Sequence, residues 1–314
     1  MFTSAFAPSR PFAALTRRGG DDKLKKGCDR DFRLRRGPST RGRDVVINGL
    51  SPSVTVDDVA DAAAEWLSLD TDPTTRGEIQ SMLDAGDNST LADRLLSGRL
   101  EFGTAGLRGE MGPGYDRMNN LVVLQTTQGL CDYVMSQLGE ETARTRGVVL
   151  GFDGRHNSRQ FAQTAARVFV SRGVKVHLFS DLIPTPLVAF GVSHLDAAAG
   201  VCVTASHNPK QYNGYKVYWG NGCQIIPPHD AGIAAAIDAN LSPWPELEDV
   251  SSETTAPDMF AHPLVSDPTE LVADAYFATV IDALCNYKGK CGDAAAVAYT
   301  PLHGVGGAVR AEDV

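Results

Sequence analysis

The chain has 314 residues, enough for two domains, and its 43% hydrophobic content is typical of a globular protein. Its formal net charge of −9 is unevenly distributed, because residues 1–50 hold 12 Lys/Arg and 5 Asp/Glu while the remainder holds 17 and 33. Such an acidic body argues against a large nucleic-acid-binding surface. We also expect no association with membranes through a spanning helix, since no run approaches about 18 consecutive apolar residues.

Residues 1–50 lack the apolar periodicity of helices and strands, and we predict a disordered basic leader there. Within its first 20 residues, Arg10, Arg17 and Arg18 occur without any acidic residue, a weak resemblance to an organelle transit peptide. The default expectation is a cytoplasmic protein, with an organelle as the alternative. The six cysteines of the chain form no Cys-x-x-Cys pair, so we expect reduced thiols rather than disulfides or a zinc site.

Residues 51–97 have helical patterning. Apolar residues between positions 56 and 67 keep helical spacing, and Asp72-Pro73 is a favourable N-cap and first-turn pair for a second helix. The apolar repeat resumes after Asn88. We predict an extension of two or three short helices without catalytic residues.

Strands and helices alternate over residues 98–241. Short apolar runs predict buried strands at 148–150, 174–179 and 201–203. Helical spacing predicts helices from Asn157-Ser158 to Gly173, over 187–195, and after His229 or Asp230 as the N-cap. This alternation predicts an α/β domain with a parallel or mixed sheet.

Residues 242–266 are rich in Pro, Ser, Thr and acidic side chains, which predicts a linker. A helix is expected over 268–286, and a strand over 294–299 leads into the loop TPLHGVGG. Residues 267–314 therefore predict an incomplete second α/β domain, because the chain ends seven residues beyond this loop.

Two glycine-containing loops carry candidate site residues, and α/β sheets place ligands at the carboxyl ends of their strands. In FGTAGLRG (102–109), glycines let backbone N–H groups approach an anion, and Arg108 adds a positive charge. The alternative is an ordinary turn, and no Gly-Lys-Ser/Thr follows as in a P-loop. In DGRHNSR (153–159), Asp153 is placed to orient Arg155; the alternative is a helix N-cap with exposed arginines.

The third loop, TASHNP, follows the strand expected at 201–203. Ser206 is a candidate nucleophile with His207 beside it and Lys216 ten residues on, and a serine hydroxyl needs a base or a strong field to react. The turn formers Asn208-Pro209 and Asn213-Gly214 would fold the loop so that Lys216 approaches Ser206. No Gly-x-Ser-x-Gly elbow is present, which argues against acyl transfer. For a serine–histidine pair alone, an ordinary loop is the alternative.

The string TASHNP followed by NGYKVY resembles the phosphoserine loop of the α-D-phosphohexomutase superfamily. FGTAGLRG, GFDGRHNSR, GCQIIPPHD and YTPLHGVG occur in the order found in that family. Together they resemble the subgroup that contains phosphoglucomutase 2 and phosphopentomutase, over about residues 65–314. The resemblance implies a mixed-sheet first domain of the phosphohexomutase type and the start of a second, similar domain.

The resemblance also implies roles for individual residues. Ser206 would carry a phosphoryl group that passes to a sugar monophosphate, giving a bisphosphate such as glucose 1,6-bisphosphate. Lys216 would be the general acid/base, His207 would assist the nucleophile, and Arg108 would steady the phosphoryl group. Supporting roles would fall to Asn208, Asp153 and Arg155. One Mg²⁺ would bind an oxygen of phosphorylated Ser206, with three aspartates as its other ligands.

The chain departs from the family in one motif. The metal-binding Asp-x-Asp-x-Asp-Arg loop, expected well after YTPLHGVG, does not occur in these 314 residues. The resemblance therefore implies a C-terminally truncated member, and we expect little or no mutase activity from this chain alone. The full-length family member is expected to be a monomer acting on small sugar phosphates.

The main functional expectation is a phosphoglucomutase-like isomerase, an intramolecular phosphotransferase that interconverts glucose 1-phosphate and glucose 6-phosphate. The alternatives in the same class are a phosphopentomutase and a glucose-1,6-bisphosphate synthase. A non-catalytic sugar-phosphate-binding remnant and a serine hydrolase are the rivals from other classes.

Overall fold

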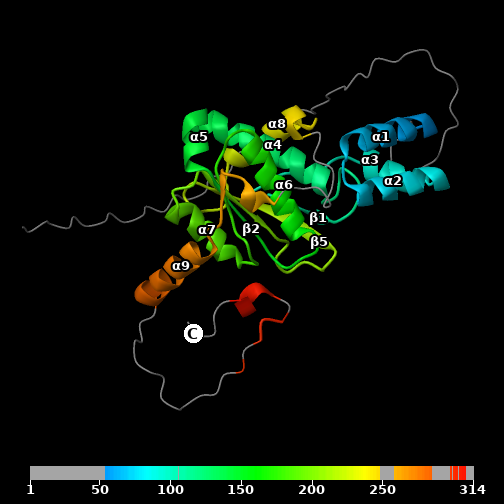
Figure 1. The fold of residues 1–314 in the computed structure, drawn as a ribbon. Coiled ribbons are helices and arrows are strands. Elements are labelled where there is room, and N and C mark those ends of the chain that lie inside the picture. The colour runs from blue at the N-terminus through cyan, green and yellow to red at the C-terminus, as the bar shows by residue number, and fades with distance from the viewer. Residues whose placement is uncertain are drawn as a thin grey trace, which may run out of the picture. The chain divides into compact units, whose positions relative to one another are not determined.

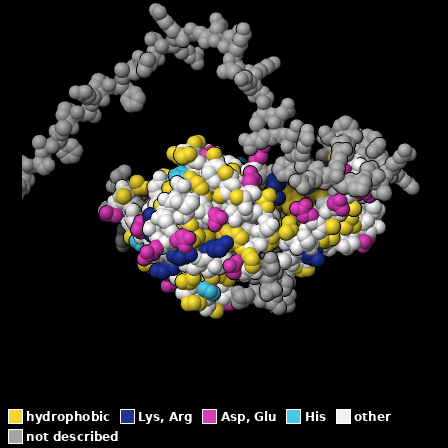
Figure 2. Space-filling view, turned by 90° about the horizontal axis from the view of Figure 1, so that it is seen from above, with side chains coloured by type: hydrophobic (Ala, Val, Ile, Leu, Met, Phe, Trp, Pro, Cys, Tyr) yellow, Lys and Arg dark blue, Asp and Glu magenta, His cyan; other side chains and the backbone are white. Residues whose placement is uncertain are grey.

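The computed structural model describes residues 54–104, 106–247, 258–284, 298, 300–302 and 304–308 (Figure 1). The leader predicted over 1–50 and nearly all of the strand expected at 294–299 lie outside the described residues. Within the described part, no helix combines the length and the apolar character needed to cross a membrane. Figure 2 shows acidic and basic side chains beside one another on the face in view, with no broad basic surface there.

The predicted helical extension is present. It consists of α1 (Val56–Leu69), α2 (Pro73–Ala85) and α3 (Asn88–Leu96). The Asp72 side chain caps α2 by accepting from the Thr74 N–H, and Pro73 occupies the first turn, as the sequence predicts. The three helices enclose a small core around the fully buried Trp66, whose ring meets Tyr115 edge-on at 5.0 Å between centroids.

The α/β domain contains one mixed sheet with the strand order β1-β5-β4-β2-β3-β6. The neighbours β2–β3, β2–β4 and β3–β6 are parallel, whereas β4–β5 and β1–β5 are antiparallel. The strands are β1 (Leu107–Glu110), β2 (Val148–Phe152), β3 (Val176–Leu178), β4 (Ala199–Val203), β5 (Tyr212–Trp219) and β6 (Val265–Ser266). The central strands β2 and β4 are buried on both faces, which explains their continuous apolar sequences.

Helices cover both faces of the sheet, and α6 and α7 contact β2 from opposite sides (Figure 1). One apolar core joins the sheet to α4, α6 and α8, and a second joins it to α7 and α9. The helices are α4 (Asn120–Leu138), α5 (Glu140–Arg146), α6 (Ser158–Ser171), α7 (Thr185–His194), α8 (His229–Ala239) and α9 (Thr269–Leu284). Short 3-10 turns lie at Pro245–Leu247, Met259–Ala261 and Val305–Ala308.

Two local predictions were wrong. The N-cap of α8 is Pro228, with no side-chain cap hydrogen bond, so neither His229 nor Asp230 caps this helix. Asn213-Gly214 forms no turn, because both residues lie inside β5, which begins at Tyr212. Pairing on both edges, to β1 and to β4, extends β5 through residues that would favour a turn in isolation.

The end of the predicted linker and the start of the predicted second domain both contact the first domain. The two-residue strand β6 pairs in parallel with β3, and Val272 of α9 is buried against α7. The Ser180 N–H after β3 donates to the Asp267 carboxylate and the Thr269 hydroxyl at the start of α9. The domain boundaries themselves stay a prediction.

Gly129 marks the closest approach of α4 to α8. A Cβ atom there would lie 2.4 Å from the backbone nitrogen of Ile237, and backbone atoms cannot yield as a flexible side chain can. We expect Gly129→Ala to lower the free energy of unfolding by about 1–3 kcal/mol, as overpacking does. Chemical denaturation followed by circular dichroism measures this change.

Gly77 provides the matched control, because it lies inside α2 and a Cβ added to it would meet no atom within 4 Å. Gly77→Ala should stabilise the protein by up to about 1 kcal/mol through the higher helix propensity of alanine. Equal effects of the two substitutions would contradict the close helix crossing at Gly129.

Candidate functional site

Ser206 lies three residues after the end of β4, in the loop at the carboxyl end of this buried central strand. Its backbone adopts the left-handed region with φ 56°, and its N–H donates to Thr204 Oγ1 at 2.9 Å. A serine in this region costs about 1 kcal/mol or more, so surrounding contacts must hold it there. In this conformation, Ser206 is exposed at the tip of the turn and is not packed against the core.

Lys216 approaches Ser206 because β4 and β5 form an antiparallel pair. Lys216 lies opposite Cys202 in the register, and its Nζ donates to Ser206 Oγ at 2.6 Å. The strand pairing therefore brings a hydroxyl and an ammonium group, ten residues apart in the sequence, into direct contact. This contact stabilises negative charge on the serine oxygen.

Arg108 adds a second cation on the same face of the sheet. It lies opposite Gly214 in the β1–β5 pair, two residues from Lys216 along β5, so both side chains project to one side. Its Nη1 donates to Asn208 Oδ1 at 3.1 Å, and its side chain is exposed. Gly106, with φ +78°, allows this approach, because a Cβ there would lie 1.9 Å from the Tyr215 carbonyl oxygen.

Arg155 holds the Ser206 loop by its backbone. Its Nη2 donates to the carbonyl oxygens of Ser206 and Asn208, both at 2.8 Å. Its Nη1 donates to the carbonyl oxygens of Pro209 and Tyr212, at 3.0 and 3.1 Å. One planar guanidinium therefore fixes four points of the loop, which a lysine ammonium cannot match in geometry.

Asp153, just after β2, anchors both the arginine and the loop. Its Oδ2 accepts from Thr204 Oγ1 at 2.6 Å and lies 3.2 Å from Arg155 Nε. Its Oδ1 accepts from the Arg155 N–H and from Ser158 Oγ. The Asp153 and Arg155 side chains are 15% and 13% exposed, so solvent screens their ion pair far less than one on the open surface.

The structure brings together six of the seven candidate residues through hydrogen bonds: Ser206, Lys216, Arg108, Asn208, Asp153 and Arg155. His207 is next to the nucleophile in sequence, but its side chain is exposed and makes no hydrogen bond or ion pair with the residues that the structure describes. Its expected assistance to Ser206 stays a prediction.

Sequence reasoning missed two residues that join these loops. Thr204 links the Asp153 carboxylate to the Ser206 N–H, although it stands inside the TASHNP string. Asn213 is fully buried and donates to the His156 carbonyl and to Ser158 Oγ, so it ties the Asp153 loop to β5. The Asn213-Gly214 pair favours a turn in isolation, so no local signal in the sequence indicated this role.

Cys202 lies on the same face as Lys216 but is buried. Burial raises the pKa of its thiol to about 12, so the neutral form prevails at ordinary pH. Cys202 is therefore a packing residue beneath the site and not a second nucleophile.

The described residues do not form a Mg²⁺ site. No group of three or more His, Cys, Asp or Glu side chains that could hold a metal ion occurs among them. Asp153 is the carboxylate that contacts the Ser206 loop, and both its oxygens are engaged by Thr204, Ser158 and Arg155. A metal ion would need ligands from outside this constellation.

Comparisons with known proteins agree with this arrangement. Residues 99–243 match the family model described as phosphoglucomutase/phosphomannomutase, alpha/beta/alpha domain I. The phosphopentomutase of Mus musculus is 43% identical over 249 residues, which cover 77% of this chain and 39% of that protein. The glucose 1,6-bisphosphate synthase of Homo sapiens is 37% identical over 252 residues, covering 78% and 39%.

A solved structure also matches, at low overall similarity. It is the phosphoglucomutase/phosphomannomutase family protein of Burkholderia thailandensis, with a TM-score of 0.42 and 24% identity over 58% of this chain and 35% of that one. The chain spans about two-fifths of the length of the curated relatives named above.

A mixed α/β sheet with helices on both faces, matched over residues 99–243, identifies domain I of the phosphoglucomutase/phosphomannomutase family. The chain belongs to the α-D-phosphohexomutase superfamily, in the subgroup of phosphoglucomutase 2-like proteins that includes phosphopentomutase and glucose 1,6-bisphosphate synthase.

Proposed function

We propose that this chain carries the reactive serine of a phosphosugar mutase, and that this serine, Ser206, is the residue that becomes phosphorylated and passes on the phosphoryl group. The observation that carries the proposal is the 2.6 Å contact between Lys216 Nζ and Ser206 Oγ, at a serine held in a left-handed turn. Phosphoryl transfer depends on positioning and on charge neutralisation more than on covalent chemistry by the protein. The loop contacts of Arg155 supply the positioning, and Arg108 and Lys216 supply positive charge.

In the proposed step, the bond between phosphorus and Ser206 Oγ breaks as a bond forms between phosphorus and a sugar hydroxyl oxygen. Lys216 gives a proton to the departing Oγ and regains the proton that the sugar hydroxyl loses. The product is a sugar bisphosphate, and the reverse step returns its other phosphate to Ser206. Arg108 lies near the loop to stabilise the charge on the transferring group.

The relatives support the pentose alternative more than the interconversion of glucose 1-phosphate and glucose 6-phosphate expected from the sequence. The phosphopentomutase of Mus musculus is more similar to this chain than the glucose 1,6-bisphosphate synthase of Homo sapiens, at 43% against 37% identity. We therefore propose pentose phosphates as the preferred substrates. On the basis of the family resemblance, we also propose that the protein uses Mg²⁺ and a bisphosphate intermediate, and that it is monomeric and cytoplasmic.

A label-and-chase experiment tests the substrate. A full-length protein that contains this domain is incubated with ³²P-labelled glucose 1,6-bisphosphate, and the labelled protein is then chased with ribose 5-phosphate or with glucose 6-phosphate. We expect faster loss of the label to ribose 5-phosphate. Preferential loss to glucose 6-phosphate would restore the glucose assignment, and failure of the protein to take up any label would favour the non-catalytic rival.

A further inference from the structure

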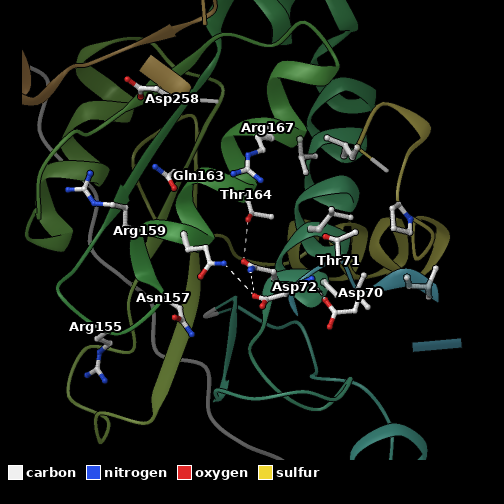
Figure 3. A pocket seen from close by; sticks show the side chains of 18 residues that line it. Asp70, Thr71, Asp72, Arg155, Asn157, Arg159, Gln163, Thr164, Arg167 and Asp258 are labelled. Atoms are coloured by element: carbon white, nitrogen blue, oxygen red, sulfur yellow. Dashed lines mark hydrogen bonds between the residues drawn. The ribbon is translucent and has the colours of Figure 1, made fainter. Parts of the chain in front are cut away.

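A cavity of about 440 Å³ lies away from the Ser206 side chain, between α6 and the segment that joins α1 to α2 (Figure 3). Ser206, Lys216 and Arg108 do not line it. Its volume falls within the range of about 300–1,000 Å³ that small-molecule sites occupy. Its walls are rich in polar side chains, so its chemistry depends on which of these lack partners.

Arg167 of α6 faces this cavity without a partner. Its buried Nε has no hydrogen bond, and the guanidinium forms no ion pair with the residues that the structure describes. Burial lowers the pKa of Arg167, which reflects the cost of holding this charge away from water. A partly buried cation without an anion destabilises a fold, so its presence needs a reason beyond stability.

Further donors lie along the same side of α6. Gln163 is one turn before Arg167, and its amide makes no hydrogen bond within the described residues. Arg159 is another turn earlier; its Nη2 donates to the Ser180 carbonyl, and its guanidinium lies 4.9 Å from the centre of the Phe152 ring. These three side chains offer hydrogen-bond donors to one wall of the cavity.

The carboxylates of the cavity are already engaged. Asp72 accepts hydrogen bonds from the Thr74 N–H at 2.9 Å, Asn120 Nδ2 at 2.7 Å and Gln160 Nε2 at 3.4 Å. Asp70 accepts from Thr75 Oγ1 and the Asp72 N–H, and the exposed Asp258, which also lines the cavity, accepts from the Phe260 N–H. Figure 3 shows Asp70 and Asp72 grouped on the side of the cavity opposite Arg167 and Gln163. On the Arg167 side of the cavity, the side chains of Arg167 and Gln163 are donors without partners among the described residues, which an oxyanion would satisfy.

We propose that this cavity binds a small phosphorylated metabolite whose phosphate group is held by Arg167 and Gln163. A guanidinium presents two parallel N–H groups that match two phosphate oxygens, and the Gln163 amide reaches a third. The remaining volume accommodates the organic part of the ligand beside Asn157 and Thr164. Arg155, which holds the Ser206 loop, also lines this cavity. The proposed phosphate ligands Arg167 and Gln163 make no hydrogen bond with that loop in the described part of the chain, and the proposal does not depend on the mutase activity.

Inorganic phosphate is the probe for the test, in a chain that also carries Arg108→Met and Lys216→Met. These two substitutions remove the cations around Ser206, so phosphate bound there does not obscure the result. Titration calorimetry should still detect phosphate binding, and adding Arg167→Met should weaken it by about tenfold or more. Arg144→Met is the matched control, because Arg144 is a half-exposed arginine of α5 outside the cavity, and it should leave binding unchanged.

A second measurement separates binding from a structural role. Without phosphate, Arg167→Met should leave the melting temperature unchanged or raise it, since it removes a partly buried unpaired charge. With phosphate, the parent should gain thermal stability that the Arg167→Met variant lacks. Binding that survives Arg167→Met, a melting temperature that falls without phosphate, or a response to malonate but not to phosphate would each overturn the proposal.

Discussion

In a full-length protein that contains this domain, replacing Ser206 by alanine is expected to abolish labelling by a ³²P-labelled sugar bisphosphate. Ser206 Oγ accepts a hydrogen bond from Lys216 Nζ at 2.6 Å, and alanine has no side-chain oxygen to accept the phosphoryl group. Mass spectrometry of the labelled chain should place the phosphate on the peptide that contains Ser206. Persistent labelling at another residue of the Ser206→Ala variant would contradict the assignment.

Two further variants show whether lost labelling reflects lost chemistry or lost folding. Ser136→Ala removes an exposed hydroxyl that bonds only the Tyr133 carbonyl, and it should be labelled like the parent. Ser206→Gly removes the same nucleophile but relieves the left-handed backbone at φ 56°. It should stabilise the protein by about 1 kcal/mol while remaining unlabelled.

Replacing Arg155 by lysine is expected to slow phosphoenzyme formation by about 10²-fold, the usual effect of misplacing a reacting group by about 1 Å. Lysine keeps the charge but cannot donate to the carbonyls of Ser206, Asn208, Pro209 and Tyr212 at once. The free energy of unfolding should fall by about 1–3 kcal/mol as these bonds are lost. Single-turnover labelling and hydrogen exchange across the loop measure the two effects.

Arg144→Lys is the matched control for this substitution. Arg144 lies in α5, outside the cavity and the Ser206 loop, and its Nε bonds a single carbonyl, that of Arg172. Its replacement should leave the labelling rate within about twofold of the parent, as expected for a surface position. If Arg155→Lys were labelled as fast as Arg144→Lys, the loop contacts of Arg155 would not position the nucleophile.

Much of the fold followed from local pattern. The apolar runs of β2 and β4 marked buried strands, because strands covered on both faces have continuous apolar sequences. Asp72-Pro73 marked the start of α2 through cap chemistry that depends only on neighbouring residues. By contrast, β6 has two residues and no periodicity of its own, and it exists as a strand because the edge of β3 pairs with it.

The sequence by itself determined the family, the buried strands β2 and β4, and the choice of Ser206 and Lys216 as partners, because apolar runs and the motif around Ser206 are encoded in consecutive residues. Only the tertiary structure decided how the Ser206 loop is held. Arg155 is 51 residues from Ser206, and Arg108 is 100 residues from Asn208. The unpartnered Arg167 likewise becomes apparent only when α6 packs beside the helical extension. Contacts of this kind arise from packing between elements, which no local pattern of residues records.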